Sequence, residues 1–180
     1  MTCLCHQIYP FDSAKKRMET IVRLSNGGYR VYVKGASEII LGFATSYDAG
    51  NGKTVPISAA DSADLVENVI NGFAKQALRV ICLGYRDFAT EQDWEDEEAL
   101  LEDLVISAFV GIQDPVRDEV PEAVKTCQHA GVIVRMLTGD NMLTARAIAL
   151  NCGIITEGDG MLVMEVRPAT GPDWVVCCVD

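Results

Sequence analysis

Two continuous apolar segments in the second half of the chain, Leu104 to Ile112 and Val132 to Leu137, constrain its fold more than any other feature. Each ends in a polar motif, at Asp114 and at Thr138, and a stretch of helical periodicity follows each motif. Strands that are apolar on both faces and alternate with helices are typical of βαβ units and of a buried parallel sheet. We therefore expect residues 104–166 to form a Rossmann-type α/β segment.

The first half has a different pattern. Met18 to Leu24 and Tyr29 to Val33 read as strands, and the Ser-Asn-Gly-Gly stretch between them is typical of a tight hairpin turn. We expect an antiparallel α+β segment over residues 1–103, a boundary near residues 103–104, and a divergent tail over 167–180 that has no clear periodicity. The other expected elements are helices over Ser37–Tyr47, Ala60–Gln76, Glu119–His129 and Asn141–Cys152, a polar loop over Asp48–Pro56, strands over Arg79–Tyr85 and Gly160–Val166, and an acidic, helix-prone connection over Glu91–Glu102.

The composition excludes some function classes. A formal net charge of -11 argues against a nucleic-acid-binding module, which would carry a basic face. No stretch reaches the roughly 18–20 apolar residues of a membrane span, so we expect no direct membrane insertion of this chain. His6 and His129 have no partner at metal-ligand spacing, and we expect no metal site. The cysteines have irregular spacing, which fits a reducing compartment, and Cys82, Cys127 and Cys152 are expected to be buried thiols.

Thr138-Gly139-Asp140-Asn141 stands where an apolar strand turns into a helix. A helix N-terminus there presents free N–H groups to a phosphate, Gly139 lets the backbone approach closely, and Asp140 or Asn141 can cap the helix. A well-capped turn without a ligand fits the four letters equally well. Asp114 and Arg117 follow the preceding strand, and neighbouring strand ends would gather carboxylates and a hydroxyl in one crevice, although a Pro-bounded strand end explains that motif alone.

Three weaker motifs precede these. Phe11 followed by Lys15, Lys16 and Arg17 can stack a purine and attract its phosphates, although a solvated charge run explains the cations as well. Lys34-Gly35 opens a helix after a strand, where a lysine can reach into a pocket or simply face solvent. Arg79 lies at the start of an apolar strand, where a charge needs solvent or a partner.

Taken in this order, the motifs resemble those of the P-type ATPase family over about Tyr9 to Ile155. The stretches VKGASEIIL, GIQDPVRDEVPEAVKTCQHAG and VRMLTGDNMLTARAIALNCGI resemble the plasma-membrane-type calcium-transporting pumps. The resemblance implies that residues 1–103 are part of the nucleotide-binding domain. It also implies that residues 104–166 are part of the phosphorylation domain, which has a haloacid-dehalogenase-like fold.

The resemblance also implies roles for single residues. Phe11 would stack on adenine, Lys16 and Lys34 would line the pocket with Gly35 allowing close approach, and Arg79 would reach the phosphates. Asp114 and Arg117 would support the active centre, while Thr138, Gly139 and Asp140 would hold the transferred phosphoryl group. ATP and Mg²⁺ are the implied cofactors, and the rest of the pump, including its membrane domain, is the implied partner, at the cytoplasmic face of a plasma membrane or an internal calcium-store membrane.

The sequence departs from the family in two places. The DKTGT segment, whose aspartate is the family's nucleophile, does not occur in these residues, and neither does the Mg²⁺-binding GDGxND segment. We therefore expect this chain to bind ATP without hydrolysing it, while the parent pump couples hydrolysis to cation transport. The alternatives are a non-catalytic regulatory or interaction module derived from a pump, a pump for another cation, and a free-standing phosphatase of the same fold. The phosphatase would need a DxD or DxxGT segment at the end of a first strand, and neither occurs in these residues.

Overall fold

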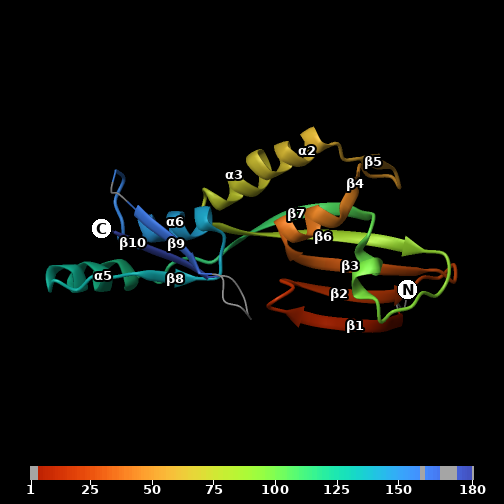
Figure 1. The fold of residues 1–180 in the computed structure, drawn as a ribbon, viewed down its shortest axis with the longest axis horizontal. Helices are drawn as coiled ribbons and strands as arrows, with labels where there is room; N and C mark the ends of the chain where they lie inside the picture. The colour runs from red at the N-terminus through yellow and green to blue at the C-terminus, as the bar shows by residue number, and fades with distance from the viewer. Residues whose placement is uncertain (1–3, 159–160, 167–173, 180) are drawn as a thin grey trace. The chain divides into compact units, whose positions relative to one another are not determined.

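The structure is a computed structural model that describes residues 4–158, 161–166 and 174–179. Figure 1 labels those of its elements for which there is room. In chain order they are β1 (Leu4–Asp12), β2 (Arg17–Arg23), β3 (Tyr29–Ala36), α1 (Ser37–Phe43), β4 (Ala44–Asp48), β5 (Thr54–Pro56), α2 (Ala59–Asp64), the π-helical turn η1 (Leu65–Ile70), α3 (Asn71–Ala74), β6 (Leu78–Phe88), α4 (Glu97–Leu101), β7 (Leu104–Gln113), α5 (Val120–His129), β8 (Met136–Thr138), α6 (Met142–Asn151), β9 (Met161–Val166) and β10 (Trp174–Val179).

The chain divides into two compact units. The first comprises Met1–Ile70 and Val80–Val110, and the second comprises Asn71–Arg79 and Gly111–Asp180. This division falls after Val110, later than the pattern change near residue 103, because the first half of β7 pairs with β4 in the sheet of the first unit.

The first unit is built on a seven-stranded sheet in the order β1-β2-β3-β6-β7-β4-β5. Figure 1 shows β1, β2, β3 and β6 side by side in this order. The pairings β1–β2, β2–β3, β3–β6 and β4–β5 are antiparallel, and β4 pairs with β7 in parallel. The expectation of a largely antiparallel sheet in the first half of the chain is therefore confirmed.

The hairpin between β2 and β3 forms as the sequence predicts. Gly27 has φ +90°, which a glycine adopts without a steric penalty. Leu24 donates its N–H to the carbonyl of Gly28, and Gly27 donates to the carbonyl of Leu24. The turn sets a register in which Arg23 faces Tyr29 and Arg17 faces Gly35.

Side chains on β3 alternate between a buried and an exposed face of the sheet. Tyr29, Val31 and Val33 are buried, whereas Tyr32 and Lys34 are exposed. The buried face packs against α1, η1 and α4. One cluster there contains Val33, Ile40, Leu41, Ile70, Cys82, Leu101, Leu104 and Ile106, and a second contains Ile21, Tyr29, Val31, Trp94 and Leu100. Below, the exposed face means the side of the sheet that bears Tyr32 and Lys34.

Several local predictions in the first half are wrong. The helix expected over Ser37–Tyr47 ends at Phe43, and Ala44–Asp48 is a strand, because its backbone pairs with β5 and β7. The loop expected over Asp48–Pro56 contains β5, and the acidic helix is confined to α4. The helix expected over Ala60–Gln76 is present as the continuous helical segment from α2 through η1 to α3.

The thiol predictions are confirmed for two cysteines and wrong for one. Cys82 and Cys152 are buried, and burial raises the pKa of Cys82 to about 12. Cys127 is exposed because α5 buries a single residue, Val124, among those the structure describes.

The second unit contains helices α5 and α6 and the three-stranded sheet β8-β10-β9. Its core is formed by Val124, Ala149, Cys152, Ile154 and Ile155. Helices α5 and α6 confirm the helices expected over Glu119–His129 and Asn141–Cys152, and β9 confirms the short strand before residue 167. Of the divergent tail, Trp174–Val179 forms β10, while residues 167–173 and 180 lie outside the described residues.

Among the residues that the structure describes, the parallel sheet expected over residues 104–166 is not found. Strand β7 lies in the first sheet, and β8 is only three residues long and pairs with β10 in an antiparallel register. A buried parallel strand requires parallel neighbours and helices on both faces, and β8 has no parallel partner among the described strands. Residues Val132 and Ile133 precede β8 without strand structure and are 53 % and 64 % exposed.

Of the helices in the described part of the chain, none combines the length and the apolar character that crossing a bilayer requires.

Candidate functional site

Lys34 lies on the exposed face of the first sheet, near the end of β3. Its cross-strand partners are Met18 on β2 and Leu83 on β6, and both side chains are half-buried. Because alternate residues of a strand point to the same side, directly paired residues share one face. The Lys34 side chain therefore shares a solvent-accessible sheet face with two flexible apolar side chains.

Gly35 is buried, and its neighbourhood explains why it is a glycine. A Cβ at this position would lie 2.7 Å from Cα of Arg17 and still closer to the carbonyl oxygen of Lys16. Real Cβ atoms essentially never approach other heavy atoms that closely. The close approach that Gly35 permits in this structure is that of the β2 backbone.

Lys16 ends the turn between β1 and β2, and its backbone is held on both sides. It has φ +53°, which is unusual for a residue with a side chain. Its N–H donates to the carbonyl of Asp12 at 2.7 Å, and its own carbonyl accepts from Ala36 N–H at 2.9 Å. The Asp12 carboxylate accepts from the N–H groups of Lys15 and Ala14, which lowers the pKa of Asp12.

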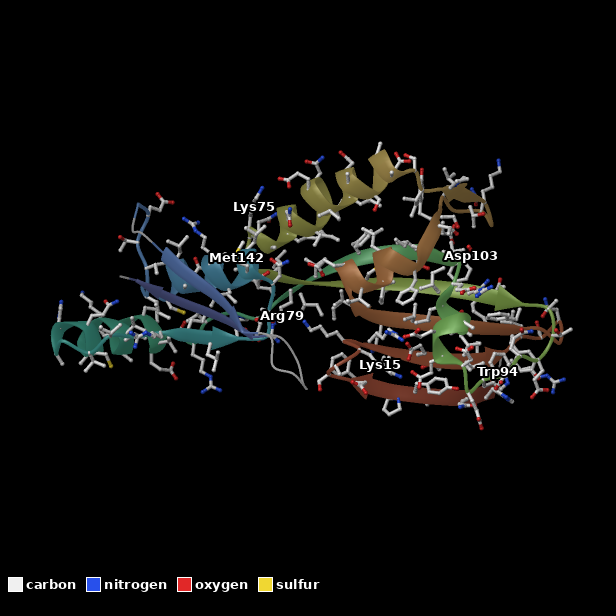
Figure 2. The ribbon with its side chains drawn as sticks, in the orientation of Figure 1. Lys15, Lys75, Arg79, Trp94, Asp103 and Met142 are labelled. Carbon is white, nitrogen blue, oxygen red and sulfur yellow. The ribbon has the colours of Figure 1, made fainter. Side chains whose placement is uncertain are left out.

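Phe11 immediately precedes this turn and is 62 % exposed. It lines a cavity of about 180 Å³, together with Tyr9, Lys15, Arg17 and Glu97 among others. Lys15 forms an ion pair with Glu97 of α4. Figure 2 shows Lys15 at this turn. An exposed aromatic ring beside a lysine-rich turn can stack on a planar base.

Arg79 lies in the second unit, at the start of β6 (Figure 2). Its guanidinium forms a fork on Asp140, with Nε 3.1 Å from Oδ1 and Nη2 3.1 Å from Oδ2, and its Nη1 lies 3.9 Å from Oδ2 of Asp114. A bidentate guanidinium–carboxylate pair is among the stronger polar contacts in proteins. The carboxylates of the two strand-end motifs therefore meet through Arg79, although their strands are not neighbours.

The Thr138–Asn141 turn has the capped geometry that the sequence predicts. Thr138 Oγ1 donates to Oδ2 of Asp140 at 3.0 Å and accepts from the Asp140 N–H at 3.1 Å. Asn141 is the cap of α6, since its Oδ1 accepts from Leu143 N–H at 2.9 Å. Gly139 is exposed between them. Thr138 and Asp140 thus form one hydrogen-bonded turn, and Arg79 is bound to the carboxylate of Asp140.

Arg117 is exposed after β7, and its carbonyl accepts from Val120 N–H at the start of α5. Within the residues that the structure describes, no group of three or more His, Cys, Asp and Glu side chains is placed to hold a metal ion. These side chains by themselves therefore do not fit a Mg²⁺ site.

Comparison with known proteins now bears on these two units. The family described as P-type ATPase, cytoplasmic domain N, matches residues 5–119, which is more than half of the chain. The chain belongs to the P-type ATPase family. The matched range includes β1, β2, β3 and β6, and with them Phe11, Lys16, Lys34 and Gly35.

Individual P-type ATPases are similar over most of the chain. Plasma membrane calcium-transporting ATPase 4 of Homo sapiens is 49 % identical over 161 residues, which cover 89 % of this chain and 13 % of that protein. Plasma membrane calcium-transporting ATPase 3 of Rattus norvegicus is 47 % identical, and ATPase 1 of Gallus gallus is 45 % identical, each over 89 % of this chain. The chain spans 13 % to 14 % of the length of these three relatives.

Sequence reasoning missed Met18 and Leu83 as candidate site residues. Both are apolar residues within strand-like patterns, and such patterns normally indicate core. The signal that could have identified them is the register of the β2–β3 hairpin, because a turn after Leu24 places Met18 opposite Lys34. Leu83 requires the β3–β6 pairing, which joins segments that are far apart in the sequence.

Proposed function

We propose that this chain is the ATP-binding cytoplasmic portion of a calcium-transporting P-type ATPase. The observation that carries the proposal is the exposed face of the first sheet, where Lys34 is paired with Met18 on one side and Leu83 on the other. It is supported by the domain match and by the names of the three relatives given above, each a plasma membrane calcium-transporting ATPase.

The chemistry of these side chains fits an adenine nucleotide. An adenine ring requires aromatic or apolar surface on its faces, and its phosphates require cations and N–H donors. Phe11 offers an exposed ring, Met18 and Leu83 offer apolar surface, and Lys34 offers a cation. In this proposal Phe11 stacks on the base, while Lys16 and Lys34 attract the phosphates.

The second part of the proposal concerns the phosphorylation domain. Residues from the end of β7 to Val166 would belong to it, with Thr138, Gly139 and Asp140 facing the transferred phosphoryl group and Asp114 and Arg117 supporting them. The exposed apolar side chains of Val132, Ile133 and Leu137 fit a haloacid-dehalogenase-like sheet completed by other parts of a longer pump.

The parent pump is proposed to hydrolyse ATP with Mg²⁺ and to couple hydrolysis to calcium transport. This chain would then lie at the cytoplasmic face of a plasma membrane or an internal calcium-store membrane, with the rest of the pump as its partner. The side chains described here supply base stacking and phosphate attraction, and Mg²⁺ would enter with the nucleotide or through residues outside this chain.

Replacing Phe11 tests the binding proposal directly. Phe11→Ala is expected to weaken the binding of ATP by about 0.5–1.5 kcal/mol, the range measured for aromatic pairs in addition to their buried area. Calorimetric titration of the purified chain measures this loss. Tyr47→Ala is a matched control because Tyr47 is also exposed, at 39 %, and lies on β4. If the Phe11 variant binds ATP as tightly as the unmodified chain, the base does not stack there.

We further propose that the chain binds ATP without forming a phosphoenzyme. A covalent intermediate requires a carboxylate nucleophile presented to the phosphate, and Asp114 and Asp140 are instead engaged by Arg79. Incubation with γ-labelled ATP and Mg²⁺, with and without calcium, is expected to leave the protein unlabelled. Acid-stable, hydroxylamine-sensitive label on the chain would show that one of its aspartates acts as a nucleophile.

A further inference from the structure

We propose that Arg17, paired with Glu19, is a positioning residue for the nucleotide-binding face. The pair anchors β2 from the buried side of the sheet and so fixes Lys16 and Met18 beside Lys34. This inference rests on the proposed function and concerns two residues that act through the backbone of β2, although both also line the cavity beside Phe11.

Arg17 is a charged side chain that is almost entirely buried, at 6 % exposure. Its Nε donates to Oε1 of Glu19 at 2.7 Å, and its guanidinium carbon lies 5.4 Å from the ring centroid of Phe43 in α1. Its Nη2 has no hydrogen-bond partner among the described residues. Burying an ion pair is expensive and on average adds little stability. Because the Arg17–Glu19 pair adds little stability, its presence in the interior is better explained by the strand geometry that it imposes.

The pair acts on β2 at two points on the same face. Arg17 and Glu19 are both buried, and Met18 between them is turned to the exposed face opposite Lys34. A bond within one strand moves with that strand, so the contact that ties the pair to the rest of the unit is the Arg17 guanidinium over the ring of Phe43 in α1, 5.4 Å from its centroid. Rotation of β2 about its axis would break this contact and expose the buried ion pair. Met18 is therefore held in its place on the exposed face.

The same anchor reaches Lys16 through the backbone. Arg17 faces Gly35 in the register, and Gly35 has no side chain that would hold the two strands apart. This contact brings the Lys16 carbonyl to the N–H of Ala36 at 2.9 Å. The positive φ of Lys16 is an unfavourable conformation that persists only where its surroundings impose it. Arg17 and the Lys16–Ala36 hydrogen bond supply that constraint.

The charged groups around the pair do not replace it. Lys15 is engaged by Glu97, and the Asp12 carboxylate accepts from backbone N–H groups. Burial raises the pKa of Glu19, so its charged form depends on Arg17 for stabilisation. Loss of Arg17 alone would leave an unpaired buried carboxylate, which is strongly destabilising.

The test therefore uses a double variant, Arg17→Met with Glu19→Leu. Replacing a buried ion pair by apolar residues of similar volume often leaves stability unchanged or raised, so this variant is expected to fold. Apolar contacts are not directional, and we expect faster hydrogen exchange at the Ala36 amide. ATP affinity is expected to fall about three- to tenfold, the loss of roughly one net hydrogen bond. The paired change Arg30→Met with Asp87→Leu is the control.

That control removes a more exposed ion pair, which joins β3 to β6, from the same sheet. Arg30 donates to Asp87 at 2.6 and 2.8 Å and stacks 4.1 Å from the ring of Tyr85, near the other end of β3. It is expected to leave Ala36 exchange and ATP affinity unchanged. The inference is overturned if the Arg17/Glu19 variant keeps either the exchange rate or the affinity of the unmodified chain. If the unmodified chain binds no ATP, the proposed function is wrong. The hydrogen-exchange rate of the Ala36 amide would then be the measurement that tests whether Arg17 holds the turn.

Discussion

Gly35→Ala is expected to destabilise the first unit by about 1–3 kcal/mol, the usual range for overpacking a tight interior. The added Cβ would meet Cα of Arg17 at 2.7 Å and Cβ of Arg17 at 2.8 Å, and the Lys16 carbonyl would be closer still. These are mainly backbone atoms, which cannot rotate away as the end of a side chain can. The strands β2 and β3 must separate, and the Lys16–Ala36 hydrogen bond must lengthen or break.

The thermal midpoint reports this loss. At roughly 2–4 °C per kcal/mol for a chain of this size, the midpoint should fall by several degrees. ATP affinity should fall together with the thermal midpoint. Lys34 is the residue before Gly35, and the carbonyl of Lys16 is the atom nearest to the added Cβ, so both lysines would be displaced. Far-UV circular dichroism recorded below the transition would show that the variant still folds.

Gly42→Ala is the matched control for that change. Gly42 lies within α1, and a Cβ there would meet nothing within 4 Å among the described atoms. Glycine inside a helix is less favourable than alanine by about 0.5–1 kcal/mol, so the control should be neutral or slightly stabilising. Equal midpoints for Gly35→Ala and Gly42→Ala would show that the strand contact at Gly35 is looser than its geometry indicates.

The elements that the sequence predicts correctly are those set by short-range rules. The β2–β3 hairpin follows from an Asn-Gly turn between two apolar stretches, and α6 follows from helical periodicity with Asn141 as its cap. Strand β4 was missed because Ala44–Asp48 is a strand only through its pairing with β5 and with the distant β7. β-propensity depends strongly on such context.

The candidate site divides in the same way. Phe11, Lys16 and Lys34 could be selected from local motifs, and their positions at a turn and on an exposed strand face follow from local rules. The engagement of Arg79 by Asp140 could not, because 61 positions separate the two residues and no local rule links them. The burial of Arg17 and Glu19 could not be predicted either, because charged residues two positions apart in a strand normally indicate a face that is turned to solvent.

Arg79→Ala is expected to weaken ATP about tenfold or more while changing adenosine binding by less than about twofold. A hydrogen bond to a charged group contributes about 1.5–3 kcal/mol, and every 1.4 kcal/mol is a factor of ten in affinity. We propose that Arg79 donates such a bond to a phosphate of ATP, and adenosine, which has no phosphate, cannot gain it. Lys34→Ala is expected to show the same selectivity, because its ammonium is exposed on the sheet face.

The structure also limits how much ATP affinity Arg79 can contribute. Without nucleotide, Arg79 is held by Asp140 and lies near Asp114, so part of its energy with a phosphate is offset by the fork that it leaves. Asp140→Asn should therefore tighten ATP in the unmodified background and have little effect once Arg79 is alanine. Arg86→Ala is the control on the same strand, since Arg86 donates to the Ala99 carbonyl at 2.7 Å. Titration of all four variants with ATP and adenosine measures the coupling between Arg79 and Asp140. If Arg79→Ala weakens both ligands equally, Arg79 does not face the phosphates and serves only to tie Asp114 and Asp140 together.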